Sequence, residues 1–217
     1  LIKASNDLID LGYAQNEDVE MVMDQAEKKI FNIMQGKNQK GFSAIKDVLI
    51  ESFAEIEKLY NQKEPITGVP TGFADLDYKT AGLHNSDLVL IAARPAMGKS
   101  AFVLNIASYA AINAKVPVAI FNLEMSKSQL VNRMLCSEAM VDSNKIRTGK
   151  IEENDWVKLA TALGPLSEAP IYIDDTAGIS IAEIRAKCRK LKLEKNIGLI
   201  VIDYLQLIQG NGKRNAS

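Results

Sequence analysis

Residues 87–102 read DLVLIAARPAMGKSAF, and this stretch combines the three features that decide the fold. The apolar run 88–93 has the length of a buried strand, the loop after it ends in Gly-Lys-Ser, and an apolar helix is expected over 101–111. A loop of small residues at a helix N-terminus lets backbone N–H groups approach a phosphate, and the helix dipole favours the negative charge. The stretch therefore predicts a strand, a phosphate-binding loop and a helix in direct succession.

The loop residues divide into side-chain and backbone roles. Lys99 is expected to reach the β- and γ-phosphate oxygens, and the Ser100 hydroxyl is expected to coordinate Mg²⁺. The pattern opens with Ala93 where glycine is usual. A plain strand–turn–helix is the alternative, but it does not account for a lysine at a helix start, where the dipole opposes positive charge. The residues expected to surround the phosphates are Ala96, Met97, Gly98, Lys99, Ser100 and Ala101.

Carboxylates that could complete such a site follow other apolar runs. Asp203 ends LIVID (199–203), about a hundred residues after the loop. Because ligands collect at the carboxyl ends of parallel strands, Asp203 is predicted to hold the Mg²⁺ shell opposite Ser100. Glu124 follows a run over 116–123 and is either the carboxylate that orients the attacking water or an acid at a helix start. Asp174 and Asp175 are a rival pair, with a solvated turn and helix cap as the other interpretation.

From residue 65 onward, the pattern predicts alternating strands and helices. Such alternation implies βαβ units and a mainly parallel sheet, which places this part in the α/β class. Pro165 and Pro170 are expected to bracket a turn before the third strand. The strands are expected at 87–93, 116–123, 171–174 and 197–203, and the helices at 101–111, 128–140 and 181–193.

The first 64 residues predict helices instead. Apolar residues recur at three- and four-residue steps over 19–34, and again over 43–61, where Ser43 can cap the helix. The polar segment GKNQKG (36–41) between them is expected to be a loop or linker. The second helix therefore packs either on the first or on something else.

Bulk composition excludes some classes of protein. Lys and Arg total 26 against 27 Asp and Glu, so no basic excess indicates a nucleic-acid partner. The 2 cysteines and 1 histidine do not predict a zinc site. The apolar runs have strand length, and the N-terminus carries no signal-peptide pattern, so no membrane association and a cytoplasmic location are expected. The first residue is Leu1, which fits an excised piece of a longer chain.

Four segments together resemble the DnaB family of bacterial replicative helicases. They are PTGFADLD (70–77), AARPAMGKSAF (92–102), NLEMS (122–126) and LIVIDYLQL (199–207). The resemblance covers residues 65–210 and implies a RecA-like P-loop core over 65–217, truncated and with an open sheet edge. It further implies that 1–36 is the helical end of an N-terminal domain and 37–64 a linker with an amphipathic helix.

The resemblance implies an ATP-driven helicase, with ATP and Mg²⁺ as cofactors, acting as a hexameric ring on single-stranded DNA. The linker helix would join subunits, and a helicase loader and primase would be partners. Residue by residue, Lys99 and Glu124 would be catalytic, Ser100 and Asp203 would hold the metal, and Arg133 would join the nucleotide site rather than the solvated helix surface. The chain alone is expected to be a poor helicase. The alternatives are another RecA-class ATPase and a module that only docks partners.

Overall fold

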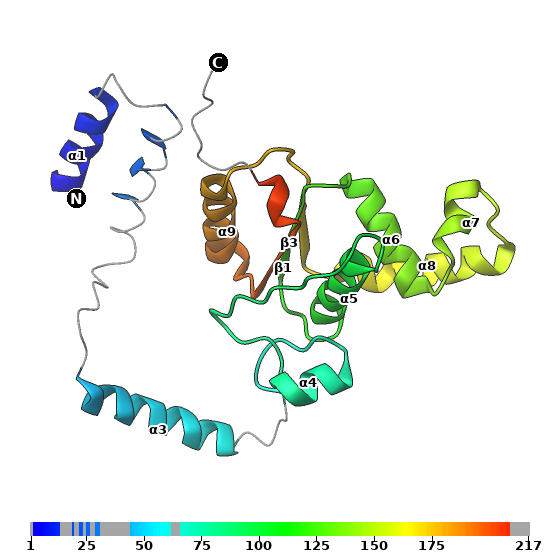
Figure 1. The fold of residues 1–217 in the computed structure, drawn as a ribbon, viewed down its shortest axis with the longest axis horizontal. Helices are drawn as coiled ribbons and strands as arrows, with labels where there is room; N and C mark the ends of the chain where they lie inside the picture. Colours follow the sequence, from blue (N-terminus) through cyan, green and yellow to red (C-terminus); the bar gives the residue numbers. More distant parts are fainter. Residues whose placement is uncertain are drawn as a thin grey trace. The chain divides into compact units, whose positions relative to one another are not determined.

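The computed structural model describes residues 2–13, positions 19, 22, 23, 25, 26, 29 and 30, and residues 44–61 and 66–208 (Figure 1). The chain divides into two compact units, residues 1–63 and 64–217.

The first unit is helical where it is described. Helix α1 spans Ile2–Tyr13, the described positions between 19 and 30 are helical, and α3 spans Ile45–Asn61. The helix predicted over 43–61 is confirmed, whereas its expected cap Ser43, the loop 36–41 and the end of the 19–34 segment lie outside the described residues. Many apolar side chains of α3 are exposed, namely Ile45, Val48, Leu49, Ile50, Phe53, Ile56, Leu59 and Tyr60.

The second unit is built on a parallel sheet of three strands. They are β1 (Val118–Asn122), β2 (Ile171–Asp174) and β3 (Leu199–Asp203), in the order β2-β1-β3. All residues of β1 are buried, as expected for the central strand of a sheet covered on both faces. The register pairs Asn122 with Asp203, so the last residues of β1 and β3 lie side by side at the carboxyl edge. The predicted strands at 116–123, 171–174 and 197–203 are confirmed.

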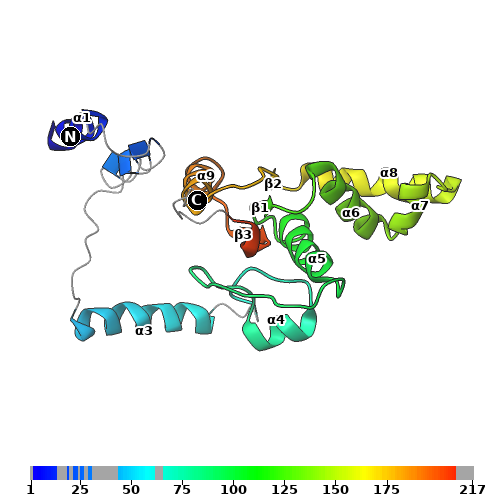
Figure 2. The ribbon, with the colours of Figure 1, turned by 45° about the horizontal axis from the view of Figure 1, so that its top comes forward.

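Helices cover both faces of this sheet (Figures 1 and 2). Helices α5 (Lys99–Ile112) and α6 (Lys127–Ala139) lie on one face, where Val118 and Ile120 pack with Leu104 in one apolar cluster. Helix α9 (Ile181–Lys195) covers the other face, where Ala119 and Phe121 pack with Ile184. Successive strand residues point to opposite faces, so this alternation fixes the three layers. The unit is an α/β, RecA-like core, as predicted.

Helices α7 (Ser143–Thr148) and α8 (Glu153–Glu168) extend the layer that contains α6, because both contact it. Helix α4 (Ala74–Thr80) precedes α5 in the chain, and the 3₁₀ turn Leu205–Leu207 follows β3. The turn predicted at Pro165 is wrong, because Pro165 lies inside α8. The residue before a proline usually avoids helical backbone because its Cβ crowds the ring, and here that residue is Gly164, which has no Cβ. The helix therefore continues to Glu168.

The strand predicted over 87–93 does not form. These residues have no strand assignment, and Leu88 and Leu90 are 84% and 70% exposed. A strand needs a neighbour to satisfy its N–H and C=O groups. Among the described residues, the outer edge of β3 is unpaired and no strand lies alongside residues 87–92. Apolar composition alone is therefore not enough to make this segment a strand.

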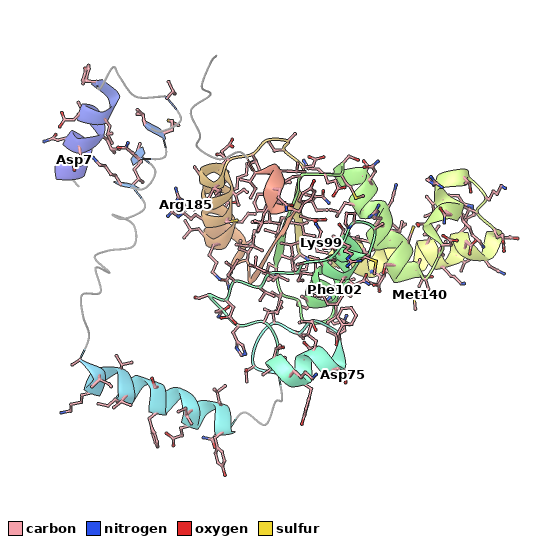
Figure 3. The ribbon with its side chains drawn as sticks, viewed as in Figure 1. Asp7, Asp75, Lys99, Phe102, Met140 and Arg185 are labelled. Carbon is pink, nitrogen blue, oxygen red and sulfur yellow. The ribbon has the colours of Figure 1, made fainter. Side chains whose placement is uncertain are left out.

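The segment 66–83 closes on itself before the phosphate loop begins. An isolated antiparallel bridge joins Val69 to Leu83. The buried carboxylate of Asp77 accepts hydrogen bonds from Thr71 N (2.8 Å), Thr71 Oγ1 (2.7 Å) and Gly72 N (3.1 Å). The ring of Phe73 packs on Phe102 of α5, with centroids 4.7 Å apart; Phe102 is labelled in Figure 3. These contacts show that the segment PTGFADLD forms a turn, which its polar residues hold together and which anchors the segment to α5.

Candidate nucleotide site

The loop before α5 presents free backbone donors. Gly98, the residue before the helix, has φ +84°, and Ala96 has φ +63°. Within residues 66–208, the N–H groups of Gly98, Lys99 and Ser100 donate to no protein group. The first N–H groups of any helix lack an intrahelical partner, and together with the dipole they favour an anion. The loop therefore has the geometry predicted for phosphate binding.

Lys99 and Ser100 meet Asp203 at the end of β3. Lys99 Nζ lies 3.0 Å from Asp203 Oδ1, and Ser100 Oγ donates to Asp203 Oδ2 at 2.5 Å. Lys99 lies where α5 begins (Figure 3). Its Nζ lies 4.3 Å from the centre of the Tyr204 ring. Asp203 is 7% exposed, so its charge is stabilised by these two partners rather than by water. The structure thus brings Asp203 together with Lys99 and Ser100, which lie about a hundred positions earlier in the sequence.

The oxygens at this junction suit a hard cation. Mg²⁺ prefers oxygen ligands and is held in nucleotide sites by one or two protein oxygens together with phosphates. The Ser100 hydroxyl and the Asp203 carboxylate supply such a pair, and they already touch. Over the described positions, no group of three or more His, Cys, Asp or Glu side chains is arranged to hold a metal without such phosphates.

Glu124 lies in the turn between β1 and α6. The strand ends at Asn122, one residue before the end of the predicted run, and the helix begins at Lys127 after the cap Ser126. The Glu124 side chain is exposed, which leaves its carboxylate accessible to water. The helix-start interpretation is also consistent with this position, because Glu124 precedes the α6 cap by two residues. The geometry therefore places Glu124 at the same sheet edge as Asp203.

Asp174 and Asp175 at the end of β2 are held by lysines, and Asp174 also accepts a hydrogen bond from Thr176 N (2.9 Å) in the turn that follows. Asp174 Oδ2 lies 2.6 Å from Lys187 Nζ, and Asp175 Oδ1 lies 2.9 Å from Lys127 Nζ. Burial alone would raise the pKa of Asp174, but hydrogen bonds from Lys187 and Thr176 outweigh it and lower the pKa to about 2. Both carboxylates are thus committed to ion pairs that join β2 to α6 and α9.

Arg133 lies on the exposed surface of α6. It lines a cavity of about 370 Å³ with Ala101, Asn105 and Ser137, among others. Ala101 directly follows the phosphate loop, so this cavity begins where the loop ends. Arg133 and the first residue after the loop therefore line the same cavity.

Sequence reasoning missed Asn122 and Tyr204. Asn122 is 1% exposed at the end of β1, and its side chain bonds the turn that carries Glu124. An Asn directly before a turn is a known signal, because its side chain often accepts from the backbone two residues on. For Tyr204, only its position directly after Asp203 pointed to the site.

Comparison with known proteins agrees with this geometry. The sequence profile of the DnaB-like helicase C terminal domain matches residues 68–217. The chain belongs to the DnaB-like helicase family.

Curated relatives extend the similarity beyond the matched domain. The replicative DNA helicase DnaC of Bacillus subtilis is 51% identical over 98% of this chain and 47% of its own length. The replicative DNA helicase DnaB of Geobacillus stearothermophilus is 49% identical over the same shares. The chain therefore spans about half the length of these relatives.

Two solved structures share the fold. One is an ATPase domain, which matches with a TM-score of 0.73 and 34% identity, over 81% of this chain and 62% of that one. The other is a DnaB-like replicative helicase, studied with its primase interactions, which matches with a TM-score of 0.70 and 31% identity over 100% of this chain and 50% of that one. None of the described helices is both long and apolar enough to cross a bilayer.

Proposed function

We propose that this chain is the ATP-binding and hydrolysing part of a replicative DNA helicase subunit. The observation that carries the proposal is the junction of Lys99, Ser100 and Asp203 beneath a loop with free backbone N–H groups. Family membership supports it, since the relatives named above are replicative DNA helicases. ATP and Mg²⁺ are the proposed cofactors.

Each residue then has one role in the proposed reaction. The backbone from Ala96 to Ala101 surrounds the phosphates, and Lys99 turns from Asp203 to a phosphate oxygen. Ser100 and Asp203 hold Mg²⁺, which neutralises the phosphate charge. Glu124 orients or deprotonates the attacking water. Arg133 reaches the nucleotide from α6.

We also propose that α3 joins neighbouring copies. Its apolar side chains are exposed along the whole helix, and Phe53 and Tyr60 are 71% and 87% exposed. Exposed apolar surface of this kind marks a protein contact, and a hexameric ring is the assembly proposed here. Single-stranded DNA, a helicase loader and primase are the further proposed partners, and strand separation is the proposed outcome of hydrolysis.

The first test measures Mg²⁺–ATP binding by calorimetry. The wild-type chain is compared with Lys99→Ala and with Lys190→Ala, which removes an exposed lysine of α9. We expect binding in the wild type and in Lys190→Ala, and none in Lys99→Ala. Binding that survives in Lys99→Ala would refute the assigned phosphate site.

The exposed face of α3 also favours a second function, in which the chain acts only as a docking module. Absence of nucleotide binding in every variant, together with self-association that Phe53→Glu abolishes, would favour that function. Nucleotide binding that is lost with Lys99 would favour the ATPase instead.

A further inference from the structure

The turn that carries Glu124 has every backbone donor occupied. Five consecutive N–H groups, from 123 to 127, each donate to an acceptor within 3.2 Å. The acceptors are the Asp203 carbonyl oxygen for Leu123, Asn122 Oδ1 for both Glu124 and Met125, Gln129 Oε1 for Ser126, and Asp175 Oδ2 for Lys127. The phosphate loop has the opposite character, because the N–H groups of Gly98, Lys99 and Ser100 donate to no protein group within residues 66–208. One loop is thus arranged to bind an anion, and the other to hold a side chain in place.

Asn122 is the residue at the centre of this turn. Its Oδ1 accepts from Glu124 N at 3.1 Å and from Met125 N at 2.8 Å. These two donors fix the orientation of the amide, because the amide nitrogen could not accept from either of them. Its Nδ2 is buried and has no hydrogen-bond partner. Buried polar atoms are almost always paired, so a donor left over at a functional edge calls for an acceptor.

The neighbour of Asn122 in the sheet is Asp203. The two residues are in register on parallel strands. Registered residues on such strands point to the same face, about 4.8 Å apart. That face is the one covered by α5, because Ile120 and Val201, two residues before each of them, pack with Leu104. Asp203 is occupied here by Lys99 and Ser100, which the proposed function assigns to phosphate and Mg²⁺.

We propose that Asn122 positions both carboxylates of the nucleotide site. Its Oδ1 holds the backbone of Glu124, and its Nδ2 donates to the Asp203 carboxylate when Lys99 leaves it for a phosphate. Asn122 acts through these two residues and does not itself touch the nucleotide. This inference rests on the proposed function for the roles of Glu124 and Asp203, but not for the hydrogen bonds to the turn.

The first experiment requires no nucleotide. Amide hydrogen exchange of Glu124 and Met125 is measured by NMR in the wild type, Asn122→Ala, Asn122→Asp and Asn132→Ala, the last of which changes an exposed residue of α6. We expect exchange about tenfold faster in Asn122→Ala, because both amides lose their acceptor. Asn122→Asp keeps an oxygen there, so it should exchange as the wild type does, like the control. Unchanged exchange in Asn122→Ala would overturn the positioning of Glu124.

The second experiment tests the donor. Mg²⁺–ATP affinity of the full-length protein is measured for the same variants, and their melting temperatures identify any that fail to fold. Both Asn122→Ala and Asn122→Asp lack Nδ2, so both should bind about tenfold more weakly, a change of about 1.4 kcal/mol. Weakening in Asn122→Asp alone would show that the added charge is responsible, and would refute the bond to Asp203.

The third experiment separates this inference from the proposed function. ATP hydrolysis is measured for Asn122→Ala and Glu124→Gln, alone and combined. At saturating Mg²⁺–ATP, where weaker binding through Asp203 no longer limits the rate, replacing Asn122 should add no further loss in the Glu124→Gln background if Asn122 orients Glu124, whereas independent effects multiply. Wild-type hydrolysis in Glu124→Gln would refute the catalytic role of Glu124, and the exchange result would still decide whether Asn122 positions the turn.

Discussion

Replacing Lys99 by methionine should destabilise the nucleotide-free protein by about 1.5 kcal/mol. At 3.0 Å, the attraction between Lys99 Nζ and Asp203 Oδ1 is about 5.5 kcal/mol at an effective dielectric constant of about 20, before desolvation is subtracted. The Lys99 side chain is 27% exposed, so the net loss lies between about 1 kcal/mol for an exposed pair and about 3–5 kcal/mol for a broken buried pair. Methionine also removes a positive charge from a helix N-terminus, where the dipole disfavours it, and this raises the free energy of unfolding by about 0.5 kcal/mol.

Urea unfolding near neutral pH without nucleotide measures this difference. The matched control is Lys190→Met on α9, which should change the free energy of unfolding by less than about 0.5 kcal/mol. A double-mutant cycle with Asp203→Asn should give a coupling of about 1–2 kcal/mol. A Lys99→Met protein as stable as the wild type, with no coupling in the cycle, would refute the conclusion that the pair holds the unliganded site together.

Three further predictions concern other buried or strained positions. The pKa of Asp174 is lowered from 3.8 to about 2, so its carboxylate contributes stability above about pH 4 that is lost as the pH falls toward 2. Asp174→Asn should remove about 1 kcal/mol at neutral pH, allowing for solvent screening, and the difference should vanish near about pH 2 in thermal unfolding. Gly72→Ala should lower the free energy of unfolding in urea more than Gly149→Ala does. Both glycines have positive φ, but only at Gly72 would a Cβ lie 2.5 Å from the Tyr109 ring. Equal losses of stability in the two variants would contradict this clash. Asp77→Ala should cost about 3 kcal/mol by leaving the Thr71 and Gly72 donors without an acceptor, and a loss below about 1 kcal/mol would contradict this network.

The sequence predicted the elements whose partners are local or lie within the described chain. Helix α5 and strand β1 follow from apolar patterns whose side chains find a core, such as Leu104 and Ile120. The segment 87–92 has the same composition, but hydrophobicity reports a tendency to be buried and carries no information on whether a neighbouring strand is available. At Pro165 the sequence predicted a turn, whereas the helix in fact continues. The rule that helices end before proline fails here because the preceding residue, Gly164, has no Cβ to clash with the ring.

The candidate site was predictable where its proposed chemistry depends on residue type at fixed spacing. Lys99, Ser100 and Asp203 each stand at the end of a regular element, and the parallel topology brings these ends together. The support of the Glu124 turn was not predictable, because it depends on a bond between Lys127 and Asp175, 48 positions apart, and on the strand register. Such contacts are fixed by the packed fold and leave no periodic trace in the sequence.

The bare apolar segment at Leu88–Ile91 has a practical consequence for the bench. Its four adjacent large side chains face water, in a unit whose described sheet also has an unpaired strand edge, and such surfaces offer a template on which a second molecule can stack. Concentrated samples should therefore aggregate or precipitate well below the melting temperature, and light scattering should rise steeply with protein concentration. A lysine in place of Val89, which is 53% exposed and outside the core clusters, should raise the solubility limit while leaving the melting temperature unchanged.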